Sequence, residues 1–320
     1  MRTALARRGV LLGVASAVVV LLTASCGGND NKSSSSSGGG GPKGKVTVGS
    51  ADFGESEIIA NMYSLALKKA GYDVGEKFKI GSREVYIKAL ENGEIDAVPE
   101  YIGTLTEYYN AQFNGPDAPN TKPLATADVD KTYAALKQLV ARKNLVALAP
   151  SQAADQNAFA VTKDFADKNS LTTLSDLTKL NGQITLGAGP ECVKRRFCLI
   201  GLQQVYGLKF KDVKKLDSGG PKTIAALGDK SIDVGLVFSS DGAVAAQNLV
   251  ILQDDKKLQT TDNITALVRS NVPQEARDIL DKVDQALTTE KLQELNKKYS
   301  VDKEDAKDLA EQFLKDANLI

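Results

Sequence analysis

From Lys45 onward, short apolar runs alternate with amphipathic segments, and this alternation limits the possible folds more than any other feature of the chain. Val46 and Val48 have the period-two spacing of a half-buried strand, and the residues from Asp52 to Glu55 predict a capping box that opens a helix. The next expected elements are a strand at 78–80, a helix at 84–91 and a strand at 95–98. Together they make a βαβαβ unit, which implies a parallel sheet covered by helices.

A similar rhythm restarts near Phe159 and indicates a second α/β lobe. Its expected strands lie at 159–162, 184–188, 213–216, 234–237 and 250–252. After Ala266 the pattern is typical of helices, with Val283 and Leu287 on one face. With 42% hydrophobic residues, the roughly 275 residues from Lys45 onward can bury two cores. We therefore predict an α/β protein of two lobes.

Composition excludes several classes of function. The chain has no histidine, which removes the usual zinc ligand, the usual general base and the Ser/His and Cys/His nucleophile pairs. No P-loop or GxGxxG motif is present to hold phosphate. Without the three arginines of the first ten residues, 37 basic side chains face 40 acidic ones, so nothing attracts nucleic acid. We expect no enzyme activity, no cofactor, no metal and no nucleic-acid partner.

The N-terminus has the layout of a secretory signal. Three arginines precede an apolar run at 10–22 and then small residues before Cys26. This end resembles a bacterial lipobox, although Thr23 stands where leucine is usual. We predict that residues 1–25 are removed, that Cys26 carries lipid and that the Ser/Gly-rich stretch 26–44 is a flexible tether. A membrane-spanning anchor is the weaker alternative, because about 13 apolar residues fall short of the roughly 20 that a spanning helix needs.

Two cysteines besides Cys26, Cys192 and Cys198, lie in the region expected to be exported. An exported compartment permits disulfides, so we expect the two to pair and to fix the shape of the short loop between them. Two free buried thiols are the alternative. A redox pair is weaker still, because the spacing is not Cys-x-x-Cys.

Several separated motifs occur in one order along the chain. They are VGSADFGESEIIANM at 48–62, EYIGT at 100–104, VGLVFSSDG at 234–242, LQDDK at 252–256 and the helical segment 287–319. This series resembles the substrate-binding lipoproteins of osmoprotectant ABC importers, the glycine betaine, choline and carnitine binders. The resemblance covers essentially all of the chain from Lys45 to Ile320.

The resemblance implies a two-lobed periplasmic-binding-protein fold of type II, with two crossover strands and the ligand in the interlobe cleft. Lobe I would comprise residues 45–154 and 263–320, and lobe II residues 155–262. The lobes would close by hinge motion near 155–157 and 262–264. Independently, ligands of open α/β sheets lie outside the carboxyl ends of the strands.

The implied function is capture of a small polar or zwitterionic solute and its delivery to a membrane permease that works with an ATPase subunit. The protein would be a monomer, lipid-anchored to the outer face of the cytoplasmic membrane. A receptor that signals ligand to a membrane partner is an alternative use of the same fold. An enzyme is the rival class, since paired carboxylates such as Asp52 with Glu55 or Asp254 with Asp255 suit acid/base work. A helix start and a surface turn explain these two pairs better.

The EYIGT motif places a tyrosine and a hydroxyl beyond a strand end, where Tyr101 can wall a pocket and Thr104 can donate to an anionic group. The alternative is a strand exit whose tyrosine packs under a helix. The family pattern also implies that Arg195 binds the ligand's carboxylate, whereas an expected lysine falls at Ala51, beside Asp52. A basic loop is otherwise usually solvated, as we expect for the neighbours of Arg195.

The family surrounds a quaternary ammonium with aromatic faces, which attract the cation. Against that pattern Tyr101 is retained, whereas the other cage positions fall at Asn157, Phe238 and Asp262. A carboxylate suits an ordinary ammonium or a hydroxylated ligand, so the sequence predicts a member whose solute differs from glycine betaine. The alternative is that the match near Asp262 is displaced by one or two positions.

Overall fold

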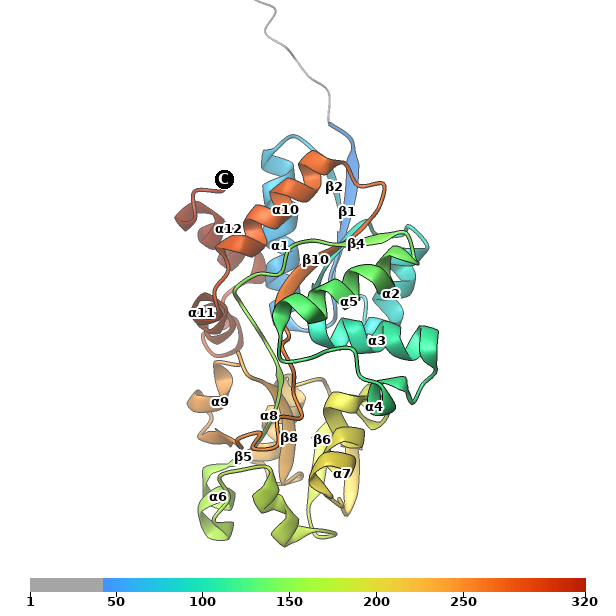
Figure 1. The fold of residues 1–320 in the computed structure, drawn as a ribbon. Coiled ribbons are helices and arrows are strands. Elements are labelled where there is room, and N and C mark those ends of the chain that lie inside the picture. The colour runs from blue at the N-terminus through green and yellow to red at the C-terminus, as the bar shows by residue number, and fades with distance from the viewer. Residues whose placement is uncertain (1–42) are drawn as a thin grey trace, which may run out of the picture. The chain divides into compact units, whose positions relative to one another are not determined.

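The computed structural model describes residues 43–320, which form one compact unit. The expected signal peptide, Cys26 and nearly all of the tether lie outside the described residues. Two five-stranded sheets form the framework, in strand order β2-β1-β3-β10-β4 and β7-β6-β8-β5-β9. Figure 1 shows them in two parts of the ribbon, with the first and last thirds of the chain around one sheet and the middle third around the other. Within this region, no helix is both long enough and apolar enough to cross a membrane.

The first sheet combines a parallel and an antiparallel half. Its strands are β1 (Lys45–Gly49), β2 (Asp73–Lys77), β3 (Ala97–Tyr101), β4 (Leu145–Ala147) and β10 (Ile264–Arg269). Strand β1 pairs in parallel with β2 and β3, whereas β10 runs antiparallel to β3 and β4. The predicted βαβαβ unit is therefore present, and the returning chain extends its sheet.

Helices cover both faces of this sheet, because each face presents apolar side chains that must be buried. One core joins the sheet to α1 (Gly54–Lys69), α10 (Gln274–Ala286), α11 (Thr289–Ser300) and α12 (Ala306–Asp316). The other joins it to α2 (Arg83–Glu91), α3 (Ile102–Asn114) and α5 (Val129–Ala141), and the short α4 (Ala118–Thr121) follows α3. Figure 1 shows α1, α10 and α12 across the sheet from α2, α3 and α5.

The second sheet is built by the middle of the chain. Its strands are β5 (Asn157–Thr162), β6 (Thr185–Ala188), β7 (Asp212–Lys215), β8 (Val234–Phe238) and β9 (Leu249–Ile251). Its helices are α6 (Lys163–Asn169), α7 (Gly201–Tyr206), α8 (Pro221–Gly228) and α9 (Ala243–Ala246), and it also contains the short helical segments η1 (Ser175–Leu180), η2 (Pro190–Lys194) and η3 (Arg196–Ile200). Two apolar clusters, one on the α6 and α7 side and one beneath α8, form its core.

The chain passes between the two sheets twice. The two passages run side by side, since Ala154 and Asn263 form an isolated antiparallel bridge and the Asp155 amide donates to the Asp262 carbonyl at 3.1 Å. Strands β5 and β10 leave this crossing in opposite directions. The hinge role and the exact lobe boundaries stay predictions.

Four local expectations are wrong. The second strand lies at 73–77 rather than 78–80, because Lys79 has a left-handed φ of 54°, which ends extended structure. The third strand extends to Tyr101, past Pro99. Strand β10 occupies residues predicted as helical, since a short apolar run does not distinguish the two by periodicity. Helix α1 begins after Phe53 without a side-chain cap, so the predicted capping box is absent.

Pro99 is tolerated within β3 because its missing N–H faces away from β10, the strand that pairs with all of β3. Ala266 of β10 lies opposite Pro99. The Ala266 N–H donates to Asp284 and its carbonyl accepts from the Leu148 amide, so neither backbone group of Ala266 points toward Pro99. On the other side of β3, β1 pairs only at Val48 with Ala97. No hydrogen bond to β10 is lost at Pro99.

Candidate functional site

A cavity of about 500 Å³ lies where side chains of both sheets converge. The first lobe contributes the starts of α1, α2 and α3 and the end of β3 to the cavity wall. The second lobe contributes the 190–197 loop, the 216–218 turn and the end of β8. All seven side chains expected at the site line it: Asp52, Tyr101, Thr104, Asn157, Arg195, Phe238 and Asp262. Their contact with a ligand stays a prediction.

Tyr101 walls the cavity with its ring, while its hydroxyl points to a buried carboxyl. The hydroxyl donates to Glu55 at 2.5 Å, and Glu55 also accepts from Ser240 at 2.7 Å and from Asn296. Burial raises the pKa of Glu55, and these three donors oppose the shift. Glu55 therefore joins α1, β3 and α11 behind the cavity and does not cap α1 as the sequence suggested.

The aromatic wall is larger than the sequence comparison predicted. The Phe53 ring lies 6.2 Å from the Tyr101 ring and 5.5 Å from the Phe238 ring, so the three form one group that we call the aromatic wall. Further aromatic residues that line the cavity are Tyr86, Tyr108 and Phe197. The expectation that only Tyr101 and Phe238 remain as aromatic surfaces is wrong. Phe53 was missed because its sequence position suggested only a helix start.

A buried ion pair lies beneath Thr104. Arg83 donates to both carboxylate oxygens of Glu100, at 2.9 and 2.8 Å, and Glu100 is 0% exposed. Arg83 also donates to the Thr104 hydroxyl at 2.8 Å. Thr104 thus accepts from a protein cation, and its hydroxyl donates to Asp262 Oδ1 at 3.4 Å. The pair was not predicted, since nothing in the sequence links the start of α2 to β3.

Asp262 supports the backbone of α3 with one carboxylate oxygen. Its Oδ1 accepts from the amides of Gly103 at 2.8 Å and Thr104 at 3.0 Å. The close approach needs the glycine of the EYIGT motif, because a Cβ at Gly103 would lie 2.2 Å from the Thr261 carbonyl oxygen. Burial raises the pKa of Asp262 to about 7, although the Thr104 amide and the charge of Arg83 oppose the shift. With this pKa, Asp262 is partly ionised at neutral pH.

Asp155, on the first passage between the sheets, also lines the cavity and was not expected there. Its Oδ1 accepts from the Ser240 amide at 2.9 Å and from the Ser239 hydroxyl at 3.2 Å. Burial raises the pKa of Asp155 well above its ordinary value, and the nearby charge of Glu55 adds to the shift. Two buried carboxyl groups, Asp155 and Asp262, therefore face one cavity from the two passages.

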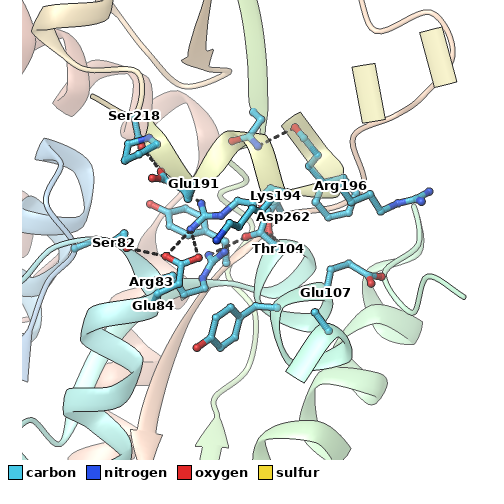
Figure 2. A pocket seen from close by; sticks show the side chains of 18 of the residues that line it. Ser82, Arg83, Glu84, Thr104, Glu107, Glu191, Lys194, Arg196, Ser218 and Asp262 are labelled. Atoms are coloured by element: carbon cyan, nitrogen blue, oxygen red, sulfur yellow. Dashed lines mark hydrogen bonds and ion pairs between the residues drawn. The ribbon is translucent and has the colours of Figure 1, made fainter. Parts of the chain in front are cut away.

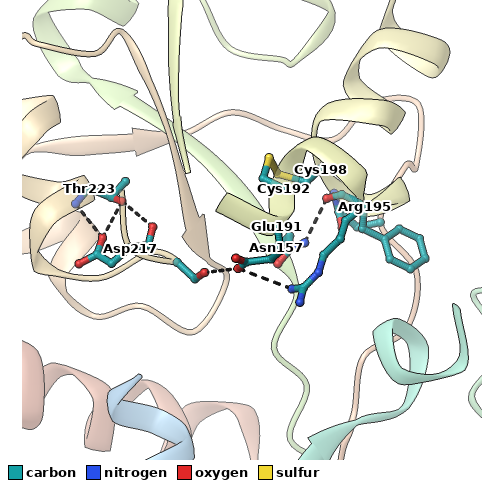
Figure 3. Close-up of a disulfide and its surroundings, with 10 residues drawn as sticks. Asn157, Glu191, Cys192, Arg195, Cys198, Asp217 and Thr223 are labelled. Atoms are coloured by element: carbon teal, nitrogen blue, oxygen red, sulfur yellow. Dashed lines mark hydrogen bonds and ion pairs between the residues drawn. A yellow bond between two sulfur atoms is a disulfide. The ribbon is translucent and has the colours of Figure 1, made fainter. Parts of the chain in front are cut away.

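A disulfide between Cys192 and Cys198, whose Cα atoms lie 5.2 Å apart, closes the loop that carries Arg195 (Figure 3). Arg195 donates to Glu84 of α2 at 3.1 Å and lies 3.8 Å from Glu191. Burial opposes ionisation of Glu84, but the charge of Arg195 and a hydrogen bond from Ser82 lower the pKa of Glu84 to about 2. The expected carboxylate clamp is thus already bound to carboxylates of the protein.

The neighbours of Arg195 also line the cavity; Lys194 is exposed, as expected, whereas Arg196 is half-buried. Arg196 donates to the Asn120 carbonyl at 3.4 Å. Lys194 is exposed and has no polar partner among residues 43–320. Asp254 and Asp255 do not line the cavity. Within the described part of the chain, no group of histidine, cysteine, aspartate or glutamate side chains is arranged to hold a metal ion.

Comparison with known proteins identifies the family. A family model described as the substrate binding domain of ABC-type glycine betaine transport systems matches residues 44–316. The chain is 29% identical to the glycine betaine-binding protein YehZ of Escherichia coli K12 over 84% of this chain and 90% of that protein. It is 28% identical to the carnitine transport binding protein OpuCC of Listeria monocytogenes over 86% and 88%.

Solved structures agree. A glycine betaine/carnitine/choline ABC transporter protein superposes with a TM-score of 0.63 at 26% identity, covering 86% of this chain and 99% of that one. Lactococcal OpuAC, closed around glycine betaine, superposes with a TM-score of 0.61 at 18% identity over 86% and 97%, which supports the two-lobed fold. Because the family model spans most of the described residues, this chain belongs to the substrate-binding domains of ABC-type glycine betaine transport systems.

Proposed function

We propose that this protein captures a small organic cation of the quaternary-ammonium class and delivers it to the permease of an ABC importer. The family is that of solute-binding components of such importers, which act outside the cytoplasm. The observation that carries the proposal is the aromatic wall of Phe53, Tyr101 and Phe238 beside the buried carboxyl groups of Asp155 and Asp262. Aromatic faces attract cations that cannot hydrogen-bond, and the carboxyl groups add charge.

A ligand in this cavity would touch both lobes and favour their closure, since walls of the cavity come from each. The similar proteins of Escherichia coli and Listeria monocytogenes are named as binders of glycine betaine and carnitine, which are quaternary ammonium compounds. The aromatic wall of this protein suits the same class of solute. The test is isothermal titration calorimetry with choline, glycine betaine, carnitine and proline. Binding of no quaternary ammonium compound at millimolar concentration would reject the proposal.

The cellular setting is proposed from the sequence. A lipidated Cys26 and the Ser/Gly-rich tether would hold a monomeric receptor on the outer face of the cytoplasmic membrane, within reach of the permease and its ATPase. Nothing in this setting requires a cofactor. Fractionation of cells should find the protein with the membrane, and its release by high salt alone would count against a lipid anchor.

A further inference from the structure

The basic side chains that line the cavity are already bound to the protein or lie exposed at its rim. Arg83 is held by both oxygens of Glu100, and Arg196 contacts the Asn120 carbonyl. Arg195 lies between Glu84 and Glu191. Lys194 alone lacks a partner within the described residues, and it is exposed. The buried cation among them, Arg83, therefore already has its charge balanced by Glu100.

The pairing of Arg195 also joins the two lobes. Glu84 belongs to α2 of the first lobe, whereas Arg195 and Glu191 belong to the disulfide-closed loop of the second. Ser82 donates to Glu84 and Ser218 donates to Glu191, which extends the chain of contacts on both sides, as Figure 2 shows. The protein supplies both charges of this contact, so closure over a ligand does not need a carboxylate from the ligand.

Several acceptor atoms of the cavity wall have no hydrogen-bond partner among the described residues. Every hydrogen bond to Asp155 and Asp262 in the described structure goes to Oδ1, and Oδ2 of each has none. Both side chains are 4% exposed and line the cavity. Asn120 Oδ1, also in a residue of the cavity wall, is buried without a donor. The two Oδ2 atoms are accessible from the cavity, so a cation or an O–H or N–H donor can bind them there. The buried Asn120 Oδ1 carries a desolvation cost that such a donor relieves.

We infer that the cleft selects monocations that carry a hydroxyl or N–H donor and no carboxylate, such as choline, over zwitterions such as glycine betaine. This inference rests on the proposed function and narrows its solute class. The trimethylammonium group lies against the aromatic wall with Asp155 and Asp262 beside it. The hydroxyl of choline can donate to one of the free acceptor atoms of the cavity wall. A carboxylate in the same place would be repelled by these acceptors and would find Arg195 already paired with Glu84.

Choline and glycine betaine are a matched pair of probes, because they share the trimethylammonium group and differ in the hydroxyl or carboxylate end. The full chain is purified in a maltoside detergent, which has no choline headgroup, and titrated with each compound at pH 8. We expect choline to bind at least about tenfold more tightly than glycine betaine, which corresponds to about 1.4 kcal/mol of binding free energy. Equal affinities, or tighter binding of glycine betaine, would overturn the inference and leave the proposed function standing. If neither compound nor any other quaternary ammonium binds, the proposed function itself fails, and the inference fails with it.

Glu84→Gln tests the role of the interlobe pair. The substitution frees the Arg195 guanidinium for a solute carboxylate, so the affinity for glycine betaine should rise about tenfold relative to that for choline. Glu94→Gln is the matched control, because this exposed glutamate lies just beyond α2, away from the cavity, and the ratio should stay as in the wild type. An unchanged ratio in folded Glu84→Gln would refute the assignment of Arg195 to the protein's own carboxylates. Should that variant fail to fold, the wild-type ratio still decides the inference.

Discussion

Removing the Arg83 guanidinium should destabilise the protein strongly and in a pH-dependent way. Arg83→Met deletes two hydrogen bonds to Glu100 and one to Thr104. Glu100 would keep the Tyr86 hydroxyl and the Tyr101 amide as donors, but it would be a buried carboxyl without a counter-charge. Breaking a buried pair by removing one partner costs about 3–5 kcal/mol.

The size of this destabilisation is set by the free energy of protonating the buried carboxylate, since protonation removes its uncompensated charge. For a carboxyl with an unfolded-chain pKa of about 4.3, that uptake costs about 4 kcal/mol at pH 7 and about 1 kcal/mol at pH 5, at 1.36 kcal/mol per pH unit. The lost Thr104 contact adds about 1 kcal/mol at both pH values. We therefore expect the variant to lose about 5 kcal/mol of unfolding free energy at pH 7 and about 2 kcal/mol at pH 5.

Urea denaturation followed by far-ultraviolet circular dichroism at both pH values measures this difference. Arg277→Met is the matched control, because this half-buried arginine donates only to the carbonyls of Val272 and Ser270. Its cost should be small and the same at both pH values. The reasoning is refuted if Arg83→Met costs less than about 2 kcal/mol at pH 7, or if its cost does not fall between pH 7 and pH 5.

Three further results are expected. Replacing Cys192 and Cys198 by serine should lower the unfolding free energy by about 2 kcal/mol, the entropy of closing so short a loop, and reduction of the wild type should reproduce the loss in urea melts. Calorimetry should show choline affinity rising up to about tenfold from pH 6 to pH 8, because Asp262 has a pKa raised to about 7 and the cation favours its ionised form. The charged groups that face this carboxyl are Arg83 and Asp155. An affinity that does not change with pH would show that Asp262 does not lie near the bound ligand. Cys26→Ala should abolish incorporation of labelled fatty acid, and absence of label from the wild type would reject lipidation.

Much of the fold follows from apolar periodicity, and the exceptions share a cause. The five strands of the second sheet lie within one or two residues of their predicted positions. Four of them contain buried apolar residues, and the edge strand β7 (DVKK) has only the half-buried Val213. Strand β2 was missed because DVGEK is polar and pairs only with β1 at the edge of its sheet. Strand β10 was missed because its apolar run is equally compatible with a buried helix, and only distant partners decide between them. The spacing of apolar residues indicates which side chains are buried, but it does not indicate which strands pair.

For the site, the family pattern predicted positions better than roles. The seven expected side chains all line the cavity, yet Arg195 binds Glu84 and Asp262 supports the start of α3. Neither partner is near in sequence, so only the folded chain reveals that these groups are occupied. For the same reason, a tyrosine placed at 262 to rebuild an aromatic cage would also remove the acceptor for the Gly103 and Thr104 amides.

Asp155 and Asp262 have a position that ties solute binding to closure. In each carboxyl group, Oδ1 holds backbone amides next to a passage between the lobes, Ser240 for Asp155 and Gly103 with Thr104 for Asp262, while Oδ2 is free. A cation near Oδ2 favours ionisation, and an ionised carboxylate is the better acceptor for the amides at Oδ1. Binding would therefore strengthen the contacts that fix both passages, at the two points where the lobes are joined. A neutral solute of the same size would fill the cavity without this effect, so we expect a cation to favour closure of the cleft more than such a solute does.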